Sequence, residues 1–286
     1  MHRAAVAASV IVALAVACPA YAQGNSQAHK KNPRPSRDPL PSAAVGTATG
    51  GVSPFAWLDD ASVLEPGSIS VAVSTVRWQG SDTSEVVLPV VDVAVGLAER
   101  VHLTASVPRV PGSPGGVEAG GEIGTSFFSV KIGMFDDPKR GVKLSVSPTL
   151  EMLGSGVLQS IEPGASRLQF GLPVSAELDR GALRLFAGGG YFSGGVWFSG
   201  LGAGIRVNPK VFLSGSVSRA WRRAGLPDVP SDRDRNEVSG SAAYAVTPHV
   251  SVFGSLGRTI ATLDENGAGT TLGCGLSLFF RPAAIK

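Results

Sequence analysis

The chain has 286 residues, of which only 16 % are charged, against roughly 25 % in an average soluble protein. Hydrophobic residues make up 43 % and glycine accounts for 37 positions, a composition that argues against an ordinary water-facing surface. The formal net charge is +3 and no Lys/Arg run is interleaved with aromatic residues, which argues against a nucleic-acid partner.

The first 22 residues have the parts of a secretory signal peptide. A short basic start precedes the apolar run AAVAASVIVALAVA, and AYA at positions 20–22 supplies small residues for cleavage. We therefore predict export with cleavage after Ala22. An alternative is a lipoprotein acylated at Cys18. Without Cys18 the mature chain keeps Cys274 alone, so metal sites built on paired cysteines are excluded, and we predict no metal and no cofactor.

Residues 23–65 change in character along their length. The first part is polar, rich in Pro and Gly and without an apolar period, which predicts a disordered periplasmic segment. The stretch SPFAWLDDASVLEPGS, residues 53–68, is too apolar for a free tail, and we expect it to pack at the mouth of the domain that follows or to plug its interior. The carboxylates of Asp59 and Asp60 are interpreted as solvated turn residues rather than a calcium site.

From residue 66 to 281 the dominant pattern is alternation, the period of a β-strand with two unlike faces. In RLQFGLPVSAEL, for example, Leu168 and Phe170 share one face and Gln169 and Gly171 share the other. Most of these segments are long enough to cross a hydrocarbon layer as tilted strands, for which about 9–11 residues suffice. The twelve segments are 67–78, 85–97, 100–108, 121–135, 141–152, 166–178, 182–192, 195–207, 210–222, 236–246, 249–261 and 270–280.

The links between these segments alternate between long and short. Long links such as RVPGSPGGVEA and GSGVLQSIEPGAS are followed by short ones such as DDPKR and DRG. Transmembrane β-barrels combine an even strand number with short periplasmic turns and longer outer loops. We therefore predict an all-β fold, a closed antiparallel up-and-down transmembrane β-barrel of about 12 strands over residues 66–281, with a C-terminal tail, 282–286. Its location would be the outer membrane of a Gram-negative bacterium.

The last segment, TTLGCGLSLFF, explains the small residues between the apolar ones. Leu272, Cys274 and Leu276 alternate with Gly and Ser, so one face is apolar and the other is small and uncharged. In lipid a sheet must close on itself and turn its apolar face outward, because no water satisfies its edges. Outer-membrane lipid is thus an expected partner. Aromatic residues near strand ends are expected interface anchors: Trp78, Tyr191, Trp197, Trp221 and Phe280, although the alternation puts Trp78 on the lumen side.

Two resemblances follow from these residues. The last strand, alternating to Phe280, resembles the C-terminal signal of bacterial outer-membrane proteins, which implies the barrel-assembly machinery as a partner. LEPGSISVAVSTVRWQ, VVDVAVGLAERVHLTASVP, GGEIGTSFFSVKIGMF and GVKLSVSPTLEM resemble the outer-membrane barrel family described as meta-pathway phenol-degradation proteins, most clearly over residues 53–152. This resemblance implies transport of hydrophobic or aromatic compounds, and it brings no established functional residue with it.

The candidate functional residues are ionisable side chains on the inward phase. Five positive charges face four negative ones, which predicts no strong charge selectivity. Either they line a water path that selects solutes, or they pair across the lumen and close it. A barrel of about twelve strands is compatible with both. The residues are Asp92, Lys131, Lys143, Glu151, Arg167, Glu177, Arg184, Arg206 and Glu237.

An enzymatic reading has little support. His249 and Ser251 have the two-residue spacing of the Ser-His pair in the outer-membrane phospholipase, but the next residues differ and His249 falls in a predicted turn. We interpret the spacing as coincidence and predict no enzyme, and we interpret His102 as a histidine of the lumen or rim. The leading hypothesis is passage of small solutes, hydrophobic or aromatic ones among them. The alternatives are a non-conducting scaffold or interaction barrel, with loop 222–236 as its contact surface, and a soluble secreted β-sandwich.

Overall fold

The computed structural model describes residues 60–81, 84–111, 122–154, 166–193, 195–222, 234–262 and 268–281. They form fifteen β-strands of one antiparallel sheet. Within these ranges there is no helix with the length and apolarity needed to span a bilayer. The predicted signal peptide, residues 23–59, the tail 282–286 and most of loop 222–236 lie outside the described residues.

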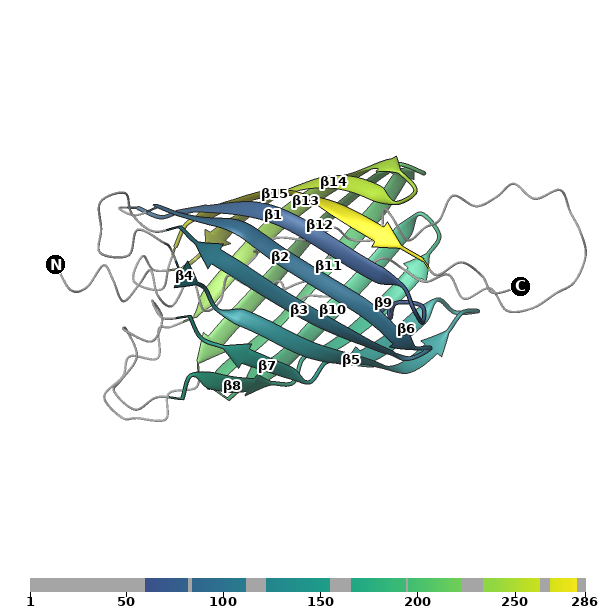
Figure 1. Cartoon of the computed structure of the whole chain (residues 1–286), viewed down its shortest axis with the longest axis horizontal. Coiled ribbons are helices and arrows are strands. Elements are labelled where there is room, and N and C mark those ends of the chain that lie inside the picture. The colour runs from purple at the N-terminus through teal and green to yellow at the C-terminus, as the bar shows by residue number, and fades with distance from the viewer. Residues whose placement is uncertain are drawn as a thin grey trace, which may run out of the picture.

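The sheet is a closed barrel because its first and last strands pair. β1 (Ile69–Gln79) runs antiparallel to β15 (Thr270–Phe280), from Ile69 opposite Phe280 to Gln79 opposite Thr270 (Figure 1). The other strands are β2 (Ser84–Ala98), β3 (Val101–Val110), β4 (Glu122–Ile123), β5 (Ser126–Asp137), β6 (Val142–Val146), β7 (Thr149–Met152), β8 (Leu168–Gly171), β9 (Val174–Arg180), β10 (Leu183–Phe192), β11 (Val196–Asn208), β12 (Val211–Arg222), β13 (Arg235–Thr247) and β14 (Val250–Ile260).

Three of the strands that cross the barrel wall are each interrupted and so divided into two: β4 with β5, β6 with β7, and β8 with β9. When each of these pairs is counted as one strand, the barrel has the twelve predicted strands in up-and-down order. Two of the breaks lie at Pro148 and Pro173, because proline has no N–H to donate to a ladder. Their carbonyls still accept, from Val130 N–H at 3.0 Å and from Ser147 N–H at 2.9 Å, so the wall stays continuous. A closed ring excludes the soluble β-sandwich.

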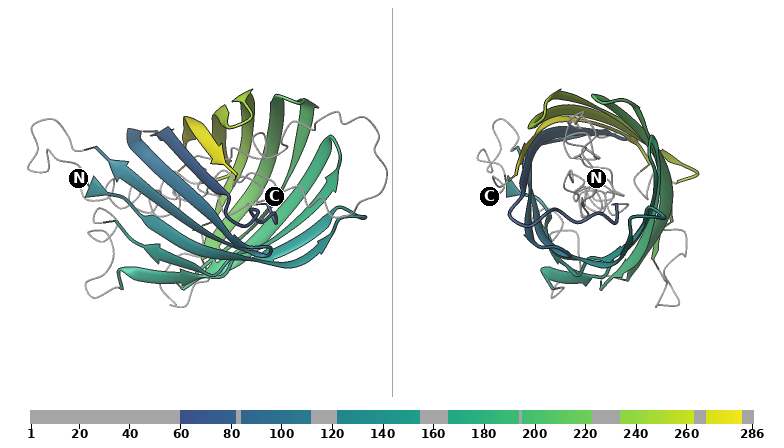
Figure 2. Two further views of the ribbon diagram at one scale, coloured as in Figure 1. Left: turned by 45° about the vertical axis from the view of Figure 1, so that its right-hand side comes forward. Right: turned by 90° about the vertical axis from the view of Figure 1, so that its right-hand side faces the viewer.

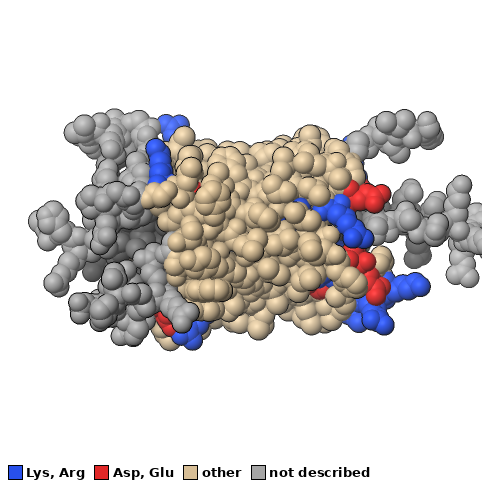
Figure 3. Space-filling view, turned by 90° about the horizontal axis from the view of Figure 1, so that it is seen from below, with Lys and Arg blue, Asp and Glu red and all other residues tan. Residues whose placement is uncertain are grey.

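Apolar side chains point outward at the middle of the barrel wall. Leu276 and its cross-strand neighbours Val73 and Val252 all point outward, with 39 %, 44 % and 40 % of their surfaces exposed. Figure 3 shows charged side chains at the two ends of the described body and a broad belt without them between. Such a belt suits acyl chains, because Arg or Lys at the bilayer midplane costs about 2–4 kcal/mol. The outward apolar stripe of the last strand is confirmed.

We call the end of the barrel that carries the short turns the periplasmic end. Turns 99–100, 181–182, 209–210 and 248–249 lie there, together with the start of β1 and the end of β15. The strand ends that flank the longer links lie at the opposite, outer end (Figure 1). This is the alternation that the link lengths predict.

Four of the five predicted anchors point outward near strand ends. Tyr191, Trp197 and Trp221 sit side by side at the outer end, with 4.9 Å between the ring centroids of Tyr191 and Trp197, and Phe280 lies at the periplasmic end. The prediction is wrong for Trp78. Its side chain is only 8 % exposed and packs inside the barrel, because its position in β1 shares the inward phase of Val76.

Candidate functional site in the barrel lumen

A coil precedes β1 inside the periplasmic half of the lumen, and we call residues 60–68 the inner segment. In the end-on view of Figure 2 it crosses the opening from one side of the ring to the other. Gly67 N–H donates to the carbonyl of Gly96 at 2.8 Å, and Gly96 N–H donates to the carbonyl of Ser68 at 2.9 Å. A Cβ at Gly96 would lie 2.0 Å from the carbonyl oxygen of Glu65, so only glycine permits this approach.

The middle of the inner segment is fixed by one polar and one apolar contact. Leu64 N–H donates to Nδ1 of His102 at 3.0 Å, so this ring nitrogen is the acceptor and carries no proton. The Leu64 side chain packs against Ala94 of β2 and Phe279 of β15. His102 is fully buried, in agreement with its predicted place in the lumen.

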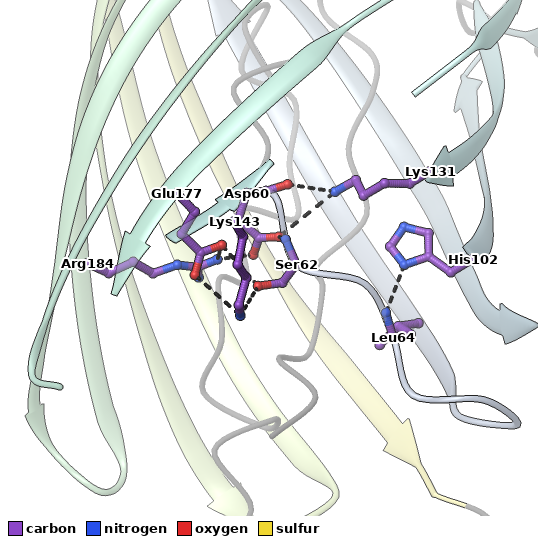
Figure 4. Close-up of polar contacts among 8 residues, drawn as sticks. All are labelled: Asp60, Ser62, Leu64, His102, Lys131, Lys143, Glu177 and Arg184. Carbon is purple, nitrogen blue, oxygen red and sulfur yellow. Dashed lines mark hydrogen bonds and ion pairs between the residues drawn. The ribbon is translucent and has the colours of Figure 1, made fainter. Parts of the chain in front are cut away.

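The tip of the inner segment enters a cluster of charged wall residues, which we call the lumen cluster (Figure 4). It consists of Asp60 and Ser62 from the segment and Lys131, Lys143, Glu177 and Arg184 from the wall. Arg184 Nη2 lies 2.9 Å from Glu177 Oε2 and also forms an ion pair with Asp60. Lys131 Nζ donates to the backbone carbonyl of Asp60 at 2.8 Å and lies 3.9 Å from its carboxylate.

Ser62 connects the segment to the other side of the cluster. Its hydroxyl donates to Glu177 Oε2 at 3.0 Å and accepts from Lys143 Nζ at 3.0 Å, while its N–H donates to Asp60 Oδ1 at 2.9 Å. Lys143 Nζ lies 3.8 Å from Glu177 Oε1. The tip of the segment is thus held by side chains of four different strands, β5, β6, β9 and β10.

Strand pairing explains why these wall residues converge. Lys143 of β6 lies directly opposite Glu177 of β9, and His102 of β3 lies directly opposite Lys131 of β5. Cross-strand neighbours in such positions share one face of the sheet, here the inward one. The charged residues of the cluster therefore pair with the inner segment and with neighbours along one sector of the wall, β3 to β10.

Asp60 is a buried ion, with 3 % of its surface exposed, and its interpretation as a solvated turn carboxylate is wrong. Burial alone raises the pKa of a carboxyl, but the charges of Arg184 and Lys131 outweigh it and hold the pKa of Asp60 at about 2. The carboxylate is therefore charged at neutral pH. The interpretation failed because its cationic partners lie on distant strands.

The remaining predicted residues lie away from the lumen cluster, and Arg167 does not have the inward, lumen-lining position predicted for it. Asp92 of β2 and Glu151 of β7 are inward and buried, away from the cluster contacts. Arg206 is half-buried at the periplasmic end of β11. Arg167 is exposed just before β8 at the outer rim, where its Nε donates to the Leu153 carbonyl at 3.3 Å.

Glu237 has a partner that sequence reasoning missed. Arg235, buried at the start of β13, lies 3.6 Å from Glu237, also buried. Both residues share the inward phase of β13, so the two-residue spacing was the available signal. Arg235 escaped notice because it borders the Asp- and Arg-rich loop 222–236, where the alternation is lost.

The sector from β10 to β15 is lined by small residues and by phenylalanine rings that lie close to the wall. Hydroxyl pairs join Ser214 to Ser241 and Ser216 to Ser239, each at 2.7 Å. Inward glycines leave room for the rings: a Cβ at Gly202 would lie 2.3 Å from the ring of Phe186. Phe212 and Phe253 have the same relation to the inward Gly204 and Gly275.

Towards the outer end the lumen contains an apolar group of side chains, the outer apolar cluster. Its rings contact one another: the centroids of Phe127 and Phe192 are 6.5 Å apart, and those of Phe192 and Phe198 are 6.1 Å apart. The members come from β1, β2, β5, β10, β11 and β12. They are Val76, Trp78, Val87, Val90, Phe127, Phe192, Phe198 and Ala220.

The predicted turn histidine is engaged by the backbone. His249 is exposed in the turn between β13 and β14, and its Nδ1 lies 3.0 Å from the carbonyl oxygen of Phe279. Ser251 is inward and buried on β14. In the part of the chain that the structure describes, no three His, Cys, Asp or Glu side chains are grouped to hold a metal ion.

The architecture defines the class of protein as an outer-membrane β-barrel. The chain superposes on an outer-membrane channel from Pseudomonas putida F1 with a TM-score of 0.56 and 14 % identity, covering 77 % of this chain and 98 % of that one. It superposes on the NanC porin with a TM-score of 0.54 and 10 % identity, covering 73 % of this chain and 98 % of that one. For the KdgM porin the TM-score is 0.53 and the identity 7 %, with 74 % of this chain and 99 % of that one covered. Neither a family model nor a curated protein sequence matches the chain.

At such low identity the likeness establishes the fold. It agrees with the broader resemblance seen in the sequence, that of an outer-membrane barrel, and leaves the narrower one, to the phenol-degradation family, as a prediction. The three solved structures are covered almost from end to end, so the similarity extends around the whole ring.

Proposed function

We propose that the barrel is an outer-membrane channel for small solutes. The observation that carries this proposal is the arrangement of the lumen wall. Bulky inward rings such as Phe186 lie over inward glycines such as Gly202, and Ser and Gly line the sector that faces the lumen cluster. A barrel built to be filled has no need to keep its large side chains near the wall.

We further propose hydrophobic or aromatic compounds as the solute class. The support is the resemblance of residues 53–152 to the phenol-degradation family, together with the aromatic rings of the outer apolar cluster. The superposed proteins provide a precedent for passage, since they are described as a channel and as porins, and KdgM was also solved in complex with oligogalacturonate.

A non-conducting barrel is the second candidate, and a specific observation favours it. The inner segment and the outer apolar cluster both occupy the lumen, one near each end. If neither of them moves, the barrel acts as a scaffold. The two functions differ in one measurable property, the current through a single molecule.

The deciding experiment is single-channel recording in planar bilayers, with two tryptophan variants on one strand. Ser239 of β13 points inward at mid-height and Val238 points outward beside it. For a channel we expect discrete steps that Ser239→Trp reduces at least about twofold, because the indole enters the path. Val238→Trp is the matched control and should leave the steps unchanged. Absence of steps from every variant, with no solute release from liposomes, would overturn the proposal.

A further inference from the structure

The carboxylate of Asp60 sits in a site made by the barrel wall. Its ion-pair partners, Arg184 and Lys131, belong to β10 and β5, whereas Asp60 belongs to the coil before β1. Both partners are almost fully buried. The wall therefore contributes the cations of this pocket, and the inner segment supplies the anion that fills it.

The wall residues of the lumen cluster carry an excess of positive charge. Lys131, Lys143 and Arg184 carry three positive charges and Glu177 carries one negative charge, so these four side chains have a net charge of +2. Buried charge is costly unless it is paired. Movement of the inner segment out of the lumen would remove one carboxylate from this group and favour binding of another.

An apolar surface lies next to the cationic one. Phe186 follows Arg184 by two residues on β10, so both side chains point inward, roughly 7 Å apart along the strand. The ring of Phe186 lies over Gly202 of β11. A ligand whose carboxylate reaches Arg184 would bring a ring or short apolar body against Phe186, an arrangement that aromatic pairs favour.

We propose that Arg184 and Lys131 form a binding site for the carboxylate of a small organic acid with an apolar body, and that Asp60 occupies this site as an internal competitor when no such solute is present. This inference rests on the proposed channel function and names its substrate class. Entry of the acid would displace the tip of the inner segment, so that ligand binding and opening of the periplasmic half of the lumen are the same event.

The test is binding of radiolabelled benzoate to the purified full chain in detergent micelles, measured by equilibrium dialysis against empty micelles. Asp60→Asn removes the competing charge without altering the wall, and we expect it to bind benzoate at least about tenfold more tightly than the parent protein. Benzamide, which lacks the charge, should bind equally to both. Adding Arg184→Gln to Asp60→Asn should abolish the gain.

A matched control and a second readout keep the outcome interpretable. Glu99→Gln changes an exposed carboxylate of turn 99–100 at the same end of the barrel, outside both the inner segment and the lumen cluster, and it should leave benzoate binding unchanged. Equal affinities of the parent and Asp60→Asn, or equal binding of benzoate and benzamide, would overturn the inference. Because binding is measured without current, a conducting barrel that ignores benzoate refutes this inference alone, whereas one that binds but never conducts refutes only the channel.

Discussion

Replacing Leu276 by arginine tests whether hydrocarbon touches the outer face. Leu276 lies on β15 between the outward Val73 and Val252, four residues from Phe280 at the periplasmic end. At about 3.3 Å per residue and a tilt of about 40°, it lies roughly 10 Å inside that end, close to the middle of an apolar band about 25 Å tall. A charge there should cost about 2–4 kcal/mol.

The assay is reversible guanidinium unfolding of the protein refolded in lipid vesicles, followed by tryptophan fluorescence. Leu276→Ala serves as the reference, so that the loss of the leucine side chain is counted separately. Thr270→Arg is the rim control, since Thr270 lies at the outer end of the same strand opposite Gln79 and Arg258. Arginine near an interface should cost only about 0–1 kcal/mol. If both arginine variants lose the same free energy of unfolding, the outer face is not in hydrocarbon.

Three further predictions concern the lumen. Gly202→Ala should lower single-channel conductance, because a Cβ 2.3 Å from the ring of Phe186 would push that ring away from the wall and into the lumen. Adding Phe186→Ala should restore the conductance. Unchanged conductance in Gly202→Ala would contradict the position of the ring against the wall. Gly96→Ala should displace the inner segment, since its Cβ would lie 2.0 Å from the carbonyl oxygen of Glu65, and hydrogen exchange in residues 60–68 should rise while the barrel keeps its gel mobility. The pKa of Asp60 is lowered from its ordinary value of 3.8 to about 2. The charged carboxylate therefore stabilises the seated inner segment by about 2 kcal/mol above pH 4, and this stabilisation is lost as the pH falls towards 2. Exchange of residues 60–68, corrected for its intrinsic pH dependence, should therefore rise over that interval in the parent protein and stay flat in Asp60→Asn.

Strand alternation made most of the fold predictable. Each strand has a two-residue period that does not depend on its neighbours. This period predicts the outward direction of Leu272 and Leu276 and the number of strands that cross the wall, twelve. Trp78 shows that residue type alone does not predict which way a strand side chain points. Its residue type suggested a membrane anchor, its phase suggested the lumen, and the phase was right, because the pleat fixes the direction of a side chain whatever its chemistry.

The lumen cluster was only half predictable. Lys131, Lys143, Glu177 and Arg184 were identified by phase, but their meeting depends on the stagger between strands, which no single strand encodes. Asp60 was misread because it lies in a coil without any period, so nothing local connects it to partners on β5 and β10. The inner segment is a tertiary feature, visible only when the ring is closed around it.

The seam between β1 and β15 joins the two ends of the barrel sequence, and the inner segment contacts the strand on the far side of that seam. This pairing closes a longer loop than any other strand contact in the sheet, and the entropy lost on closure grows with loop length. Leu64 packs on Phe279 of the last strand and Glu65 reaches Arg281 just beyond it, so the chain before β1 grips the same strand that β1 must capture. A nascent barrel that has lost these contacts would hold its final strand by one edge alone and should close more slowly.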